Sequence, residues 1–184
     1  SETIVKRAQT AIHDLQNSLT LASRTFGQQA VTLDELAVRL LWGINRTAYE
    51  VMQLTSGLSV RLLQPDRDWT SGLLRLALSL ELRTPQRHWQ FDLARRVNLA
   101  ERPRGTQPLA PTALTQAHDH LWCLQPIQLS SLEAQFWQQI EQVAPELALL
   151  RVSTEVTIAA GELQGELGVV QLKAGFELNP NKPK

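Results

Sequence analysis

Five leucines at every second position constrain the fold of this chain more than any other feature of its sequence. Leu74, Leu76, Leu78, Leu80 and Leu82 alternate with residues that are polar or small. Side chains of a β-strand point alternately to its two faces, so this spacing predicts a strand with one apolar face and one polar face. Such a strand is typical of an antiparallel sheet that is covered on one side only.

Further segments show the same two-residue alternation. Residues 58–62 precede the leucine-rich strand, and residues 89–97 follow it after the turn sequence TPQR, which predicts a hairpin. Residues 150–158 and 163–178 predict a second strand pair. In the last segment the apolar positions change parity near Val169, which predicts a β-bulge or a strong bend at that point.

Apolar residues at spacings of three and four predict helices. The three longer ones are at residues 3–25, 33–55 and 131–144. Thr32 and Glu35 form a capping box at the start of the second helix, and Ser130 and Glu133 form another before the third. Residues 112–124 are ambiguous, and we interpret them as containing a short helix.

These elements predict an α+β fold, with an N-terminal helical hairpin and an antiparallel sheet made of two strand pairs with a helix between them. We expect the hairpin in residues 1–56, as an arm or as part of the core, the sheet in residues 57–178 and a flexible tail in residues 179–184. Both strand pairs open with Leu-Leu-Arg, at 73–75 and 149–151. This repeat indicates either a duplicated helix-plus-hairpin unit or chance in a leucine-rich chain.

The composition is typical of a folded intracellular protein. Of the 184 residues, 43% are hydrophobic and 20% are charged, which argues against wholesale disorder. Cys123 is the only cysteine, so no intrachain disulfide can form, and no run of 18 apolar residues is available to span a bilayer. The opening SETIVKRAQ is not a signal peptide as written, although a presequence could have been removed, so we expect a cytoplasmic protein.

The residues most suggestive of chemistry are His118, Asp119, His120 and Cys123. Imidazole and thiolate groups can bind a transition metal or form a Cys–His nucleophile pair. On a strand His118 and His120 would share a face, and on a helix His120 and Cys123 would, so neither geometry gathers all the ligands. The commoner arrangement is a surface histidine pair beside a buried cysteine. We therefore predict no cofactor, no catalytic residue and no metal, with His118, His120 and Cys123 as the candidates if a metal site exists.

Charge is unevenly distributed along a chain whose net charge is zero. Residues 61–104 carry nine arginines against five acidic residues, whereas residues 130–178 carry two basic residues against seven glutamates. The two regions could neutralise each other in the fold or present two charged faces to partners. The candidate interaction residues are the arginines of the first hairpin: Arg75, Arg83, Arg87, Arg95 and Arg96.

The sequence favours an interaction function over a catalytic one. Amphipathic helices and uneven charge, without a visible set of nucleophile and base, predict a non-enzymatic interaction, assembly or adaptor protein that binds another protein or itself as a homodimer. One alternative is a small-molecule or lipid-binding domain with an apolar pocket between sheet and helix. A second alternative is nucleic-acid binding through the arginines of residues 61–104. Trp89 and Phe91 of this region share the apolar parity, so we expect them in the core and not as platforms on which bases stack.

Overall fold

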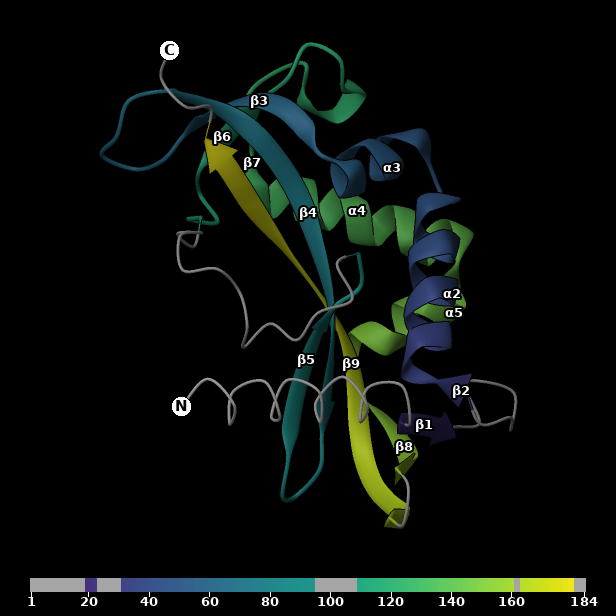
Figure 1. Cartoon of the computed structure of the whole chain (residues 1–184). Coiled ribbons are helices and arrows are strands. Elements are labelled where there is room, and N and C mark those ends of the chain that lie inside the picture. Colours follow the sequence, from purple (N-terminus) through teal and green to yellow (C-terminus); the bar gives the residue numbers. More distant parts are fainter. Residues whose placement is uncertain (1–18, 23–30, 95–108, 161–162, 181–184) are drawn as a thin grey trace, which may run out of the picture.

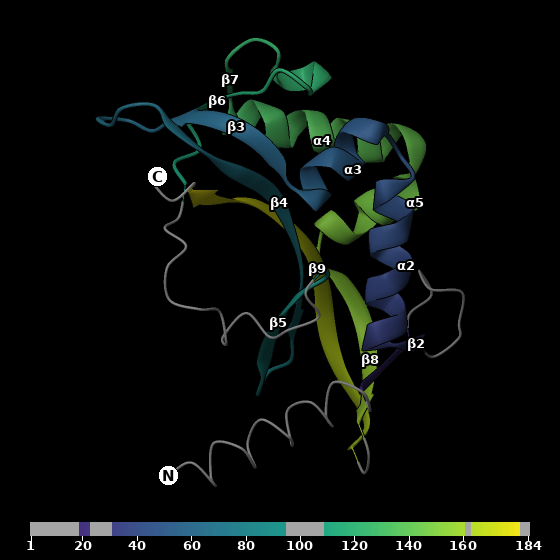
Figure 2. The same ribbon diagram turned by 45° about the horizontal axis from the view of Figure 1, so that its top comes forward.

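Helices cover one face of a large antiparallel sheet. The computed structural model describes residues 19–22, 31–94, 109–160 and 163–180. In both views the helices lie on the same side of the strands (Figures 1 and 2). The helices are α2 (Leu33–Asn45), α3 (Tyr49–Ser56), α4 (Leu129–Val143) and α5 (Pro145–Ala148). Short 3-10 helices occur at Leu121–Cys123 and Leu149–Arg151.

Nine strands of the described chain form a single sheet, and every pairing in it is antiparallel. The strands are β1 (Leu19–Ala22), β2 (Val31–Thr32), β3 (Leu58–Leu63), β4 (Thr70–Arg83), β5 (His88–Asp92), β6 (Leu114–Gln116), β7 (Ile127–Gln128), β8 (Thr154–Ala160) and β9 (Leu163–Pro180). The order is β2-β1-β8-β9-β4-β3-β6-β7, and β5 pairs with β4 beyond the end of β3. The long strands β4 and β9 therefore form the spine of the sheet.

The leucine alternation of β4 is confirmed and determines where the core lies. Leu74, Leu76, Leu78, Leu80 and Leu82 are each at most 2% exposed and belong to one continuous apolar cluster. That cluster also contains the buried faces of α2, α3 and α4. Because the same cluster joins helices and sheet, α2 and α3 are part of the core and not an arm. The prediction of an α+β fold with an antiparallel sheet is confirmed.

The predicted helix at 33–55 is two helices. The capping box at its start is confirmed, with Glu35 N donating to Thr32 Oγ1 and Thr32 N donating to Glu35 Oε2, each at 3.1 Å. The helix ends at Asn45 because the Thr47 hydroxyl donates to the Ile44 carbonyl at 2.7 Å and competes with the helical backbone bond. The chain is then extended at Ala48, where φ is −158°, before α3 begins. An N-terminal pair of helices followed by strands is thus present, but the pair is α2 and α3.

The helix predicted at residues 3–25 is wrong where the structure describes it. Leu19–Ala22 is strand β1, which pairs with β8 and with β2. The rest of that predicted helix lies outside the described residues. The positions of Leu19 and Leu21 fit a two-residue alternation as well as a helical period. A short apolar run of this kind forms a strand when a neighbouring strand, here β8, offers an edge to pair with.

Two predictions around α4 are also corrected. Residues 112–124 contain strand β6 and a 3-10 turn in place of the predicted short helix. The capping box of Ser130 and Glu133 is wrong, because the N-cap of α4 is Gln128 and makes no side-chain cap bond. The first amides of α4 donate instead to loop carbonyls: Leu129 N to Ala113 O and Ser130 N to Pro111 O, both at 2.9 Å.

The second strand pair begins later than predicted and has no bulge at Val169. Residues 149–151 form a 3-10 helix, so the second Leu-Leu-Arg is not a strand and the duplicated unit is wrong. The ladder between β4 and β9 runs without interruption from Val169 to Pro180, and the irregularity lies in β8 between Ile158 and Ala160. Leu167 and Val169 of β9 lie on the polar face of the sheet, opposite Thr157 and Glu155 of β8. β9 extends to residue 180, and residues 181–184 of the predicted tail lie outside the described residues.

Candidate functional site

Charged side chains gather on the face of the sheet opposite the leucines. Three adjacent strands, β4, β5 and β9, contribute them in register. We call this set the charged face: Arg75, Glu81, Arg83, His88, Asp92, Lys173 and Glu177. Odd-numbered positions of β4 alternate with the buried leucines, so the same pattern that builds the core also brings these groups together.

Arg75 lies between two carboxylates. Its Nη2 is 2.8 Å from Asp92 Oδ2 and 3.3 Å from Glu177 Oε1, and the three side chains are 14%, 1% and 8% exposed. Burial alone would lower the pKa of Arg75, but the hydrogen bonds and charges of Asp92 and Glu177 outweigh it and raise that pKa. The single charge of the guanidinium is therefore shared between two buried acids, and its Nε has no hydrogen-bond partner among the described residues.

Glu81 is the centre of a second group on the same face. Its carboxylate contacts Lys173 Nζ, Arg83 Nε at 3.3 Å and His88 Nε2 at 3.2 Å, and it is 4% exposed. The hydrogen bond from Lys173 is the main cause that lowers the pKa of Glu81, against a burial effect that would raise it. Glu81 is therefore ionised at neutral pH, with the cations of Lys173 and Arg83 beside it and His88 as a third contact.

The three predicted interaction arginines that the structure describes, Arg75, Arg83 and Arg87, do not form a free basic strip. Arg75 is buried between acids, and Arg83 contacts Glu81 and also Ser153 Oγ at 3.5 Å. The Arg87 guanidinium lies 6.0 Å from the centre of the Trp89 ring. Arg95 and Arg96 lie outside the described residues. The ion pairs Arg75–Glu177 and Glu81–Lys173 join the first hairpin to β9, so the charged regions 61–104 and 130–178 neutralise each other in part.

His118, His120 and Cys123 are not brought together as ligands. His118 is exposed, whereas His120 is buried, with Nε2 2.9 Å from the Glu50 carbonyl and Nδ1 accepting from Trp122 N at 3.3 Å. Because Nδ1 is an acceptor, Nε2 carries the proton, so both ring nitrogens are occupied. Burial raises the pKa of the Cys123 thiol to about 12. Within the described ranges, no group of three metal-binding side chains occurs.

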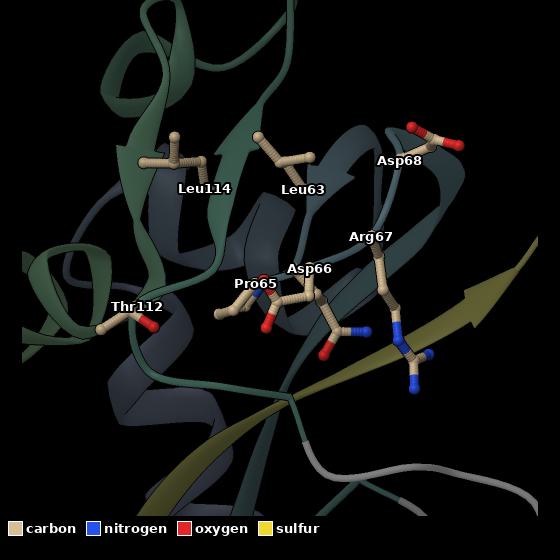
Figure 3. Close-up of a pocket in the computed structure, with 8 residues that line it drawn as sticks. Leu63, Pro65, Asp66, Arg67, Asp68, Thr112 and Leu114 are labelled. Atoms are coloured by element: carbon tan, nitrogen blue, oxygen red, sulfur yellow. The ribbon is translucent and has the colours of Figure 1, made fainter.

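A surface cavity of about 530 Å³ lies between the β3–β4 turn and β6 (Figure 3). Its lining is Leu63, Gln64, Pro65, Asp66, Arg67, Asp68, Thr112 and Leu114. Asp66, Arg67 and Asp68 are all exposed, and in Figure 3 the side chains of Arg67 and Asp68 point in different directions. These groups do not converge on a point inside the cavity, so the arrangement does not enclose a ligand.

A second cavity, of about 450 Å³, lies at the other end of the sheet. Its lining is Arg83, Thr84, Pro85, Glu155, Leu167, Gly168 and Val169. Neither cavity lies between the sheet and the helices, where the side chains of the core cluster pack together. The apolar pocket expected between the sheet and the helices therefore stays a prediction, since neither of these two cavities lies there.

The outer side of α2 and α3 exposes large apolar side chains. Val38 is 44% exposed, Trp42 63%, Tyr49 65% and Met52 41%. We call these four residues the aromatic face. The Arg46 guanidinium lies over the Trp42 ring, 4.2 Å from its centre. This set is unusual because large apolar residues of monomers are seldom exposed in groups.

The apolar spacing of residues 33–55 does not single out Trp42 as an exposed residue. The buried stripe of α2 is Leu33, Leu36, Ala37, Leu40 and Ile44, and Trp42 lies on the opposite side of the helix. The signal that could have placed Trp42 correctly is its spacing of four residues from Arg46, which is a residue of the solvated face.

Comparison with models of protein families found no match, and neither the curated proteins nor the solved structures contain a match to this chain. In the part of the chain that the structure describes, the helices are too short or too polar to cross a membrane.

Proposed function

We propose that this chain is a non-enzymatic protein-interaction module that binds through the aromatic face. The observation that carries the proposal is the exposure of Trp42 and Tyr49, at 63% and 65%, on neighbouring helices whose opposite sides are packed in the core. Tryptophan, tyrosine and arginine are the residues that most often dominate the energy of protein interfaces. Burying Trp42 and Tyr49 against a partner removes a large apolar area from water, which favours association.

The geometry of Trp42 suits it to be an anchor. The cation–π contact with Arg46 restricts the indole without covering it, since the ring keeps most of its exposure. A side chain that is already ordered before binding loses less conformational entropy when a partner covers it.

The charged face supports a structural function better than a binding one. Its cations and carboxylates contact one another, with Arg75 bridging Asp92 and Glu177, and Glu81 meeting Lys173. A ligand of either charge would have to break ion pairs that are largely buried, which is costly. The aromatic face requires no such rearrangement.

Site-specific photo-crosslinking tests the proposal. Val38, inside the aromatic face, is replaced by p-benzoylphenylalanine in cells that produce this protein naturally, and Trp69, in the β3–β4 turn, is replaced in a control. We expect a defined protein adduct from position 38 and a different, weaker set from position 69. The adduct partner is then purified, and its affinity for Trp42→Ala is expected to fall by roughly tenfold or more. Identical adducts at both positions, or an unchanged affinity, would contradict the proposal.

A further inference from the structure

The exposed side of α2 has two acids at its start, one arginine in its middle and one at its end. Asp34 and Glu35 lie in the first turn, and Arg39 and Arg46 follow in the middle and at the end of the helix, all of them exposed. Val38 and Trp42 lie between the two ends. No salt bridge joins Asp34 or Arg39 to another described residue.

These residues share one stripe of the helix. Glu35, Trp42 and Arg46 follow each other at spacings of seven and four residues, which places them on the same side of an α-helix. Val38 is four residues before Trp42 and lies beside it on that side. The stripe therefore reads acidic, apolar, aromatic and basic from its start to its end.

A stripe of this order is complementary to itself in the antiparallel direction. A two-fold axis level with residues 40 and 41 would place Glu35 opposite Arg46 of a second copy, and Arg46 opposite Glu35 of that copy. The same axis would bring Trp42 level with Arg39 of the second copy and gather the Val38 and Trp42 side chains of both copies near the centre. In a two-fold interface each contact occurs twice, so a residue that meets a second residue of the partner copy must be met in turn by that copy's first residue.

We propose that a second copy of this chain covers the aromatic face, with the two α2 helices packed antiparallel about a two-fold axis. This inference rests on the proposed function and names its partner. The charge order within the stripe is what favours a second copy over an unrelated protein or a membrane surface. An anionic membrane attracts basic residues only, and here the acids at the start of α2 offset the arginines.

The contact is short, so the dimer is expected to be weak. From Glu35 to Arg46 the stripe is about 16 Å long at a rise of about 1.5 Å per residue. One helix face of this length, extended by Tyr49 and Met52 of α3, is at the small end of specific interfaces. Self-association should therefore be measured up to protein concentrations of a few hundred micromolar.

Sedimentation equilibrium of the whole chain provides the first test. We expect the weight-average mass to rise from monomer towards dimer with concentration, and the dissociation constant of Trp42→Ala to be weaker by roughly tenfold or more. Trp69→Ala is the matched control, since Trp69 is also partly exposed and also lies under an arginine, Arg61, at 4.9 Å, but outside the aromatic face. This control should associate like the unmodified chain.

Charge reversal tests the antiparallel register. Arg46→Glu makes both ends of the stripe acidic and should weaken the dimer, and adding Glu35→Lys, which the axis places opposite residue 46, should restore part of the loss. Far-ultraviolet circular dichroism of each variant checks that the helices are retained. A chain that stays monomeric at all concentrations, or a double variant that is no better than Arg46→Glu, overturns the inference. If position 38 crosslinks to a different protein while the chain stays monomeric, the proposed function stands and the dimer does not.

Discussion

At the scale of single residues, the most consequential feature is that charged groups are buried on the side of the sheet opposite α2, α3 and α4. Arg75, 14% exposed, is in contact with both Asp92 and Glu177. Buried ions are tolerated only when each has a partner, so the arrangement is sensitive to the loss of any one member.

Removing Arg75 is expected to destabilise the fold strongly. In Arg75→Ala the carboxylates of Asp92 and Glu177 lose their shared cation while remaining buried, so we expect the free energy of unfolding to fall by about 3 kcal/mol. Urea denaturation followed by tryptophan fluorescence measures this. Arg87→Ala, at an exposed position, should change it by no more than about 0.5 kcal/mol. Equal effects of the two substitutions would refute the buried-pair account.

Glu81 predicts an acid-dependent loss of stability. Its pKa in the fold lies below the ordinary value of 4.5, so its stabilising contribution is fully present above 4.5 and is lost as the pH falls through the lower folded value. Glu81→Gln should therefore flatten the fall of the unfolding free energy with decreasing pH below 4.5. Glu146→Gln, an exposed control, should leave the profile as it is. A Glu81→Gln profile parallel to that of the unmodified chain would show that Lys173 does not hold this carboxylate.

Cys123 is expected to be unreactive in the native protein. It is completely buried, and burial raises its pKa to about 12, so very little thiolate is present at pH 8. A thiol reagent such as dithionitrobenzoate should label it only after denaturant is added. Rapid labelling of the native chain at that pH would mean that the segment around Leu121–Cys123 is open.

At the scale of secondary-structure elements, the close approach of β9 to β4 and β8 has a testable consequence. A Cβ at Gly168 would lie 2.7 Å from Ile158 Cδ1 and 2.8 Å from the Arg83 carbonyl, whereas a Cβ at Gly175 would have no atom within 4 Å. Gly168→Ala should destabilise the chain by about 1 to 3 kcal/mol through overpacking. Gly175→Ala, in the same strand, should be neutral or stabilising by up to about 1 kcal/mol. Thermal unfolding of the two variants compares them directly, and a reversed order would exclude the register described for β9.

The elements also show what could be predicted from the sequence. The Leu74–Leu82 alternation predicted its strand because a two-residue period is incompatible with a helix. The Thr32 capping box could be predicted from the sequence because it joins two residues that are only three positions apart. Leu19–Ala22 and residues 112–124 were misassigned because their structure depends on strands and loops distant in sequence. For the same reason the contacts of Arg75 with Asp92 and Glu177 could not be read from their positions along the chain.

At the scale of the whole molecule, α2, α3, α4 and α5 lie on one side of the sheet (Figure 2). The ion pairs of Arg75 and Glu81 lie on its other side. The outer surface of α2 and α3 differs from both, because its large apolar side chains are exposed and the Trp42 ring contacts the Arg46 guanidinium. The exposure of Trp42 and Tyr49 together, on a chain of zero net charge, favours association with a partner. The central claim is therefore that association takes place through Trp42.

Fluorine NMR of the chain labelled with 5-fluorotryptophan tests that claim most directly. The five tryptophans give separate probes, and single Trp→Phe variants assign them. As the protein concentration rises, or as a purified crosslinked partner is added, the Trp42 resonance should shift or broaden while that of Trp69 stays unchanged. A Trp42 resonance that responds neither to protein concentration nor to the added partner, or a response confined to Trp69, would contradict the account.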